Sequence, residues 1–171
     1  RTRNSRPVRD LLALAGLVWL MARSKPNSSG IADLGFVDVD GTRFDVDPEL
    51  DAQLAELEPV TRGIVVRLLV QARAEGMQVR IVPKTGARRT RAQQQQEVAE
   101  GDSQLEDGPH IYGAAVDLMF LGSDPWGKSH PWARLGAIGK ALGLGWGGDW
   151  KTLKDLGHFQ RKDWRALRSV A

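Results

Sequence analysis

A charged residue lies inside one of the most apolar segments of the chain. The segment Ala114–Phe120 (AAVDLMF) has the composition of a buried strand, and Asp117 is its single charge. An ionised carboxylate there is costly unless it pairs with a cation or binds a metal ion. His110 precedes it by seven residues, a separation of roughly 23 Å along an extended strand. The two side chains can therefore share a metal ion only if the chain folds back, and Gly113 is placed to allow this.

The remaining patterns predict an α+β fold, a small, mainly antiparallel sheet with helices packed around it. Pro59 stands where a first-turn proline belongs and Gly76 where a helix ends, which predicts a helix between them. We expect strands at 36–39, 43–46, 77–82 and 114–120, a hairpin turn at Asp40-Gly41, a loop at 102–113, a short segment at 157–160, and further helices at 48–57, 90–101, 132–142 and the C-terminus.

The cysteine count excludes several kinds of chemistry. The 171 residues contain no Cys, which rules out a disulfide scaffold, a zinc ribbon, an iron–sulfur cluster and a thiol nucleophile. A transition metal would therefore be bound by imidazoles and carboxylates. The chain has three imidazoles, those of His110, His130 and His158. His130 has no motif around it and is expected at the surface or at the start of a helix.

The net charge of +3 comes from one end of the chain. Residues 1–25 hold six basic side chains against Asp10, a charge of +5, which leaves −2 for the other 146 residues. We therefore expect no nucleic-acid partner. The apolar run Leu11–Ala22 is shorter than the ~20 residues that a bilayer core requires. It resembles a secretory signal peptide or a marginal anchor, which would contact a membrane or the export machinery; the alternative is a buried or partner-binding helix.

Composition divides the chain into three regions. Residues 1–25 form the basic and apolar N-terminal segment, and residues 26–50 contain a linker followed by the β-hairpin. Residues 51–171 are long enough for one globular domain with its own core. We expect this domain to carry the chemistry and the chain to be a monomer.

Two further elements add polar side chains. Asp155 stands three residues before His158, so across a turn one can hold a metal ion while the other handles protons. The Arg88-Arg89 pair before the helix at 90–101 offers recognition of a carboxylate or an oxyanion. Each element alone is ordinary on a protein surface. Together, two imidazoles and one carboxylate supply three ligands for tetrahedral Zn²⁺ with a fourth position open to water, and Asp155 is the spare carboxylate, as in a zinc hydrolase.

These motifs, in this order, resemble the zinc D-alanyl-D-alanine carboxypeptidase and L-alanyl-D-glutamate peptidase family of bacterial and phage cell-wall enzymes (VanY-like, endolysin-type branch). Residues 108–117 match the family's SxHxxGxAxD motif, with Gly108 in place of Ser, and Asp155 and His158 match its acid three residues before a His. Residues 89–94 match an Arg-Thr-x-x-x-Gln element, and 146–150 (WGGDW) resembles the endolysin-type branch. The resemblance covers roughly residues 50–162.

The resemblance implies a hedgehog- and DD-peptidase-like fold and a hydrolase that binds one Zn²⁺ and cuts peptidoglycan stem peptides. The resemblance implies that the protein acts in the cell envelope, in the periplasm or outside the cell. A phage origin is compatible with such a location. The WGGDW and DxxHF elements favour an L-alanyl-D-glutamate endopeptidase, with a D-alanyl-D-alanine carboxypeptidase as the alternative. An alternative of another class is a non-catalytic, zinc-stabilised module that binds cell wall or protein.

The resemblance also assigns roles to residues. His110, Asp117 and His158 are the implied zinc ligands, Asp155 is the implied base, and Arg89 contacts the substrate or the developing oxyanion. Substrate contacts are expected from Arg88, Gln94, Tyr112, Trp146, Asp149 and Trp150. Tryptophans gather in the C-terminal third of the chain, where most are expected in the core and one or two could line a groove for glycan or peptide; they are Trp126, Trp132, Trp146, Trp150 and Trp164.

Overall fold

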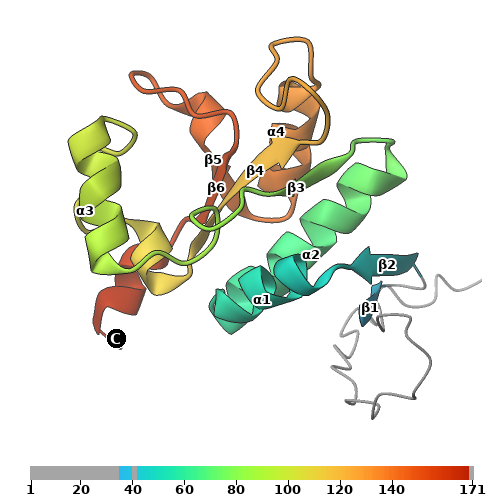
Figure 1. Ribbon diagram of the computed structural model, residues 1–171, viewed down its shortest axis with the longest axis horizontal. Helices are drawn as coiled ribbons and strands as arrows, with labels where there is room; N and C mark the ends of the chain where they lie inside the picture. The colour runs from blue at the N-terminus through green and yellow to red at the C-terminus, as the bar shows by residue number, and fades with distance from the viewer. Residues whose placement is uncertain (1–34, 40–41, 170–171) are drawn as a thin grey trace, which may run out of the picture.

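The computed structural model describes residues 35–39 and 42–169 (Figure 1). The apolar run at 11–22 and the turn at Asp40-Gly41 lie outside the described residues, so the prediction of the region at 1–25 stays a prediction. Within the described part of the chain, no helix has the length and apolar character needed to cross a membrane.

A four-stranded sheet forms the centre of the domain. Its strand order is β3-β4-β6-β5, and each neighbouring pair is antiparallel. The predicted α+β fold with a small antiparallel sheet is confirmed. The strands are β3 (Val79–Ile81), β4 (Ala115–Phe120), β5 (Leu144–Trp146) and β6 (His158–Arg161). A separate hairpin, as predicted, joins β1 (Gly35–Val39) to β2 (Thr42–Val46).

The predicted helices form, and polar side chains mark where they begin. Asp47 accepts a hydrogen bond from the backbone N–H of Leu50, Glu58 accepts one from Thr61, and Thr90 begins its helix with a capping box. The C-terminal segment differs from prediction, because it forms the 3-10 helix η3 (Trp164–Ser169). The α-helices are α1 (Pro48–Glu56), α2 (Pro59–Ala74), α3 (Arg91–Glu100) and α4 (Trp132–Ala141).

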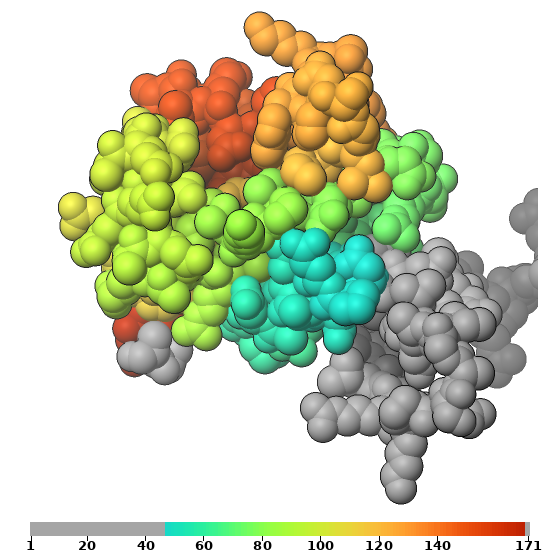
Figure 2. Space-filling model, in the orientation of Figure 1, coloured from blue at the N-terminus to red at the C-terminus, as the bar shows by residue number. Residues whose placement is uncertain are grey.

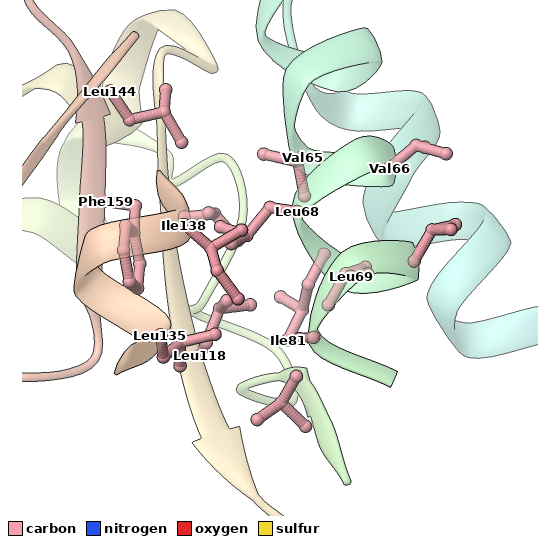
Figure 3. Packing of buried hydrophobic residues seen from close by; sticks show 14 of the residues in the cluster. Val65, Val66, Leu68, Leu69, Ile81, Leu118, Leu135, Ile138, Leu144 and Phe159 are labelled. Carbon is pink, nitrogen blue, oxygen red and sulfur yellow. The ribbon is translucent and has the colours of Figure 1, made fainter. Parts of the chain in front are cut away.

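The core lies between α2, α4 and one face of the sheet (Figure 3). On β4, the alternate residues Val116, Leu118 and Phe120 face this core, so Asp117 faces the opposite side of the sheet. On β6, Phe159 belongs to the core, which turns the neighbouring His158 the same way as Asp117. In the view of Figure 1, α3 lies across the sheet from α2. The apolar core thus holds a rigid sheet whose other face carries the polar residues.

Candidate metal centre

A reversal of the chain brings His110 back toward Asp117. His110 lies in the 3-10 helix η1 (Pro109–Tyr112), which ends at Gly113 with a φ of 61°. A Cβ at Gly113 would also lie 2.8 Å from the backbone nitrogen of Glu58, so glycine alone fits here. His110 Nε2 consequently lies 3.3 Å from Asp117 Oδ2. The fold-back predicted at Gly113 is confirmed.

Pairing between β4 and β6 supplies the third member of the cluster. Asp117 and His158 stand directly opposite each other in the ladder, so their side chains project from the same face of the sheet. His158 Nδ1 lies 2.8 Å from Asp117 Oδ1 and 3.4 Å from His110 Nε2. The three side chains therefore form one buried cluster, assembled by strand register across a long stretch of sequence.

The outer nitrogen of each imidazole is bonded to an acceptor. His110 Nδ1 lies 2.7 Å from the carbonyl oxygen of Ala87, and His158 Nε2 lies 2.9 Å from Gln160 Oε1. Because these oxygens only accept, each outer nitrogen donates, and in the neutral ring the inner nitrogen carries the lone pair. Two lone pairs and the carboxylate of Asp117 thus converge within 4.8 Å of one another. A cation fits among three converging acceptors, and this donor set with its outer hydrogen bonds is one that suits zinc.

The protonation preferences of the cluster follow from its burial and its charges. Burial by itself would raise the pKa of Asp117, but His110 and His158 hold that pKa well below its usual value. Burial would lower the pKa of His158, yet the hydrogen bond and charge of Asp117 raise it overall. Asp117 therefore favours its ionised form and His158 its protonated form, and a metal ion that binds His158 would displace that proton.

Arg89 forms an ion pair with Asp117. Its guanidinium is 8% exposed, its Nη2 lies 2.5 Å from Asp117 Oδ2, and its Nε donates to the carbonyl of Thr85. The neighbouring Arg88 is exposed, and its Nε donates to the carbonyl of Ile111. Arg89, rather than Arg88, therefore belongs to the site, while its predicted contact with substrate stays a prediction.

Asp155 lies beside the cluster on a loop whose path depends on a glycine. Its Oδ1 accepts a hydrogen bond from the backbone N–H of Gly157, and burial, followed by the negative charge of Asp117, raises its pKa. A Cβ at Gly147 would lie 2.4 Å from the carbonyl oxygen of Asp155, so the close approach of these two segments requires glycine. The WGGDW run thus places the carboxylate that the sequence predicts as a base.

A cleft of about 740 Å³ opens onto the cluster. In Figure 2 the surface is hollowed between the lime-green segment that includes α3, the orange-red segment between β5 and β6, and the orange segment that follows β4. Four of the six exposed large apolar side chains among the described residues lie in its wall. The polar part of the wall includes His110, Asp117, His158, Asp155 and Arg89, and the exposed apolar side chains, called the rim below, are Leu105, Trp126, Trp150 and Leu153.

The predicted substrate-contacting residues divide into two groups. Gln94 and Trp150 line the cleft, although the amide of Gln94 is engaged in bonds to Ser103 and Leu105. The other four have partners outside the cleft lining. Arg88 bonds Ile111, Tyr112 donates to Asp107, Trp146 packs against Gly136 and Gly148, and Asp149 pairs with Lys140.

The six predicted substrate contacts did not include Trp126 and Leu153, which line the cleft, although Trp126 is one of the five tryptophans of which one or two were expected at a groove. Neither stands in a motif, and an exposed tryptophan in a loop has the same sequence signature as a buried one. His130, in contrast, lies where it was expected, just before α4 and outside the metal cluster, with its ring stacked on Phe120.

Known proteins are similar to this chain over the region of the site. The family described as D-alanyl-D-alanine carboxypeptidase matches residues 102–161, which include the three cluster residues and Asp155. The L-alanyl-D-glutamate peptidase of Listeria phage A118 is 31% identical over 113 residues, covering 64% of this chain and 39% of that protein. The peptidoglycan L-alanyl-D-glutamate endopeptidase CwlK of Bacillus subtilis is 40% identical over 63 residues, covering 30% of this chain and 37% of that protein. The chain thus spans less than half the length of these relatives.

A solved structure shares the fold. The Serratia marcescens L-Ala D-Glu endopeptidase ChiX superimposes with a TM-score of 0.57 at 23% identity, over 70% of this chain and 91% of that chain. The resemblance inferred from the ordered motifs is confirmed by these matches.

Proposed function

We propose that the chain is a member of the family of D-alanyl-D-alanine carboxypeptidases and L-alanyl-D-glutamate peptidases, and that it is a zinc-dependent peptidase that hydrolyses peptidoglycan stem peptides. The main support for this proposal is that the acceptor groups of His110, Asp117 and His158 converge beside Asp155 in one cleft. The bond we assign is L-alanyl-D-glutamate, since both relatives carry this activity in their names. Cleavage of D-alanyl-D-alanine is the second candidate, favoured by the description of the matching family.

The proposed mechanism uses residues with separate tasks. His110, Asp117 and His158 would hold the Zn²⁺, and the bound ion would supply Lewis acidity for the scissile carbonyl and for a water molecule. Asp155 accepts the proton of the attacking water and returns it to the leaving amine. Its raised pKa in the metal-free protein reflects an environment that also suits the protonated form. Arg89 holds Asp117 in place and puts positive charge in the cleft wall, where negative charge develops on the carbonyl oxygen.

Digestion of purified muropeptides tests the assigned bond. The endopeptidase proposal predicts fragments cut between L-alanine and D-glutamate, identified by mass spectrometry. Release of terminal D-alanine alone would contradict this assignment and support the carboxypeptidase candidate.

Replacing the proposed base tests whether the zinc site is catalytic. We expect Asp155→Ala to keep one zinc ion per chain and to lose about 10²–10⁴-fold in kcat, because proton transfer then lacks its base. The matched control is Asp51→Asn, a change to an exposed carboxylate on α1, which should leave the rate unchanged. Hydrolysis that survives in Asp155→Ala would remove this residue from the mechanism, and a zinc-loaded wild type without hydrolysis would favour a non-catalytic module.

The substrate also suggests where and how the protein works. A peptidoglycan peptidase acts in the cell envelope, the periplasm or outside the cell, and we propose that the domain does so as a monomer. Gel filtration of the zinc-loaded chain tests this oligomeric state. Contact of residues 1–25 with a membrane or the export machinery stays a prediction.

A further inference from the structure

One indole lies open on the rim of the cleft. Trp126 is 54% exposed, although its ring lies parallel to that of Trp132, with centroids 6.1 Å apart and planes 6° from each other. Trp132 is buried, and its Nε1 donates to the carbonyl of Gly127. Trp126 is therefore oriented by a buried neighbour while more than half of its surface remains open to solvent.

The loop that carries Trp126, between β4 and α4, is braced at several points. His130 Nε2 lies 2.7 Å from the carbonyl oxygen of Asp124, and its ring stacks on Phe120 with centroids 4.2 Å apart. The backbone N–H of Phe120 donates to the carbonyl of Pro125. A side chain on a braced loop loses little conformational freedom when a ligand binds. Trp126 is thus an exposed aromatic surface held ready for a ligand.

Trp126 stands where the cleft meets a second, smaller one of about 300 Å³. Both clefts are lined by Asp102, Trp126, Leu153 and Asp155, so the second adjoins the proposed catalytic cleft. Lys154 and Gly157 also line the smaller cleft. A Cβ at Gly157 would lie 3.1 Å from the ring of Trp126, which places the indole against the backbone directly before the proposed ligand His158.

We propose that Trp126 and the smaller cleft bind the N-acetylmuramyl sugar to which the stem peptide is attached. The C–H groups of a pyranose ring can pack on an indole face, because aromatic rings offer large apolar area with a polar edge. Asp102 and Lys154, on the walls of the same cleft, supply an acceptor and a donor for hydroxyl and acetamido groups.

The sugar is the expected occupant because it lies close to the scissile bond in the substrate. This inference rests on the proposed function, since in peptidoglycan the L-alanine of the stem peptide is joined directly to the muramyl lactyl group. The L-alanyl-D-glutamate bond therefore lies one amino acid from the sugar, and an enzyme that cuts it must accommodate the sugar beside the metal site. The smaller cleft, which shares Asp155 with the proposed catalytic cleft, is placed to meet this requirement.

Two substrates that differ only in the sugar test the inference. One is N-acetylmuramyl-L-alanyl-D-glutamyl peptide, and the other is the same peptide with an N-acetyl group in place of the sugar. With the zinc-loaded full chain, we expect Trp126→Ala to reduce kcat/KM on the muramyl substrate about tenfold more than on the sugar-free peptide, equivalent to about 1.4 kcal/mol. Trp126→Leu should show the same selective loss, and Trp126→Phe should retain most of the selectivity. Leu121→Ala, an exposed position of the same loop outside both clefts, should change neither rate.

The outcomes separate this inference from the proposed function. If the wild type cuts both substrates and the Trp126 variants lose equally on both, the sugar site is wrong and the endopeptidase proposal stands. A wild type without preference for the muramyl substrate also overturns the sugar site. If the wild type cuts neither substrate between L-alanine and D-glutamate, both proposals fall. The Trp126→Leu and Trp126→Phe variants keep the test decisive if Trp126→Ala fails to fold.

Discussion

The metal cluster and the rim of the cleft are built in opposite ways. His110 and His158 are 3% and 6% exposed, and both ring nitrogens of each lie within 3.4 Å of a polar atom of another residue. The rim residues Trp126 and Trp150 are 54% and 37% exposed and come from different loops. The cluster therefore takes its geometry from the sheet and its neighbours, whereas the rim takes its shape from connecting segments. Chemistry fixed on a rigid element and recognition carried by loops is a division that enzymes use widely.

This contrast predicts two separable sets of effects. Changes in the cluster should alter metal content first and activity as a consequence. Changes at the rim should alter the use of substrate while metal content stays the same.

Removal of one cluster member should break the site completely. We expect His158→Ala to lose both bound zinc and hydrolysis, because Asp117 and His110 alone offer too few ligands for a stable tetrahedral site. Elemental analysis after dialysis measures the zinc. The matched control is His130→Ala, which removes the imidazole outside the cluster and should keep its zinc. Stoichiometric zinc in His158→Ala would contradict the ligand assignment.

Removal of a hydrogen-bond partner of a proposed ligand should weaken metal binding without abolishing it. Gln160 Oε1 accepts the hydrogen bond from His158 Nε2, which orients the ring and leaves Nδ1 as the inner ligand atom. Gln160→Leu removes this acceptor, and we expect zinc affinity to fall by about 10- to 100-fold. Competition with a chromophoric chelator measures the affinity, and Gln160→Glu, which restores an acceptor, should recover it. An unchanged affinity in Gln160→Leu would show that this hydrogen bond does not position the ring.

A change at the rim should spare the metal. The ring of Trp150 lies 5.0 Å from that of His158, tilted by 45°, and forms part of the cleft wall. We expect Trp150→Ala to reduce kcat/KM on muropeptides by up to about tenfold, with kcat/KM largely retained in Trp150→Phe, because a truncated aromatic contact typically costs 1–2 kcal/mol. Zinc content should equal that of the wild type. A loss of zinc in Trp150→Ala would break the distinction between cluster and rim.

The cluster could be predicted from the sequence because its residues carry strong local signals. Asp117 is a charge inside an apolar strand, Gly113 marks the reversal, and Asp155 precedes His158 at a recognisable spacing. Local patterns do not contain the register that places Asp117 opposite His158, because the two residues are 41 positions apart. The register of β4 against β6 is determined by how the apolar residues of both strands pack in the core.

Other features could not be predicted, for physical reasons that differ. The strand β5 (Leu144–Trp146) has a glycine at its centre and shows no apolar alternation, and it forms because β6 offers it a free edge. The C-terminal segment has a helical pattern but forms the 3-10 helix η3, in which Trp164 is buried. The position of Trp126 on the cleft rim depends on how its loop packs on Trp132, which no local pattern records.

Metal replacement in a single preparation tests the central claim most directly. Zinc is removed from the purified chain with a chelator, and Zn²⁺ is returned in steps while the hydrolysis of peptidoglycan is measured. We expect no activity in the metal-free protein, followed by a linear rise that ends at one zinc ion per chain. Full activity in a chain shown by elemental analysis to contain no metal would contradict this expectation.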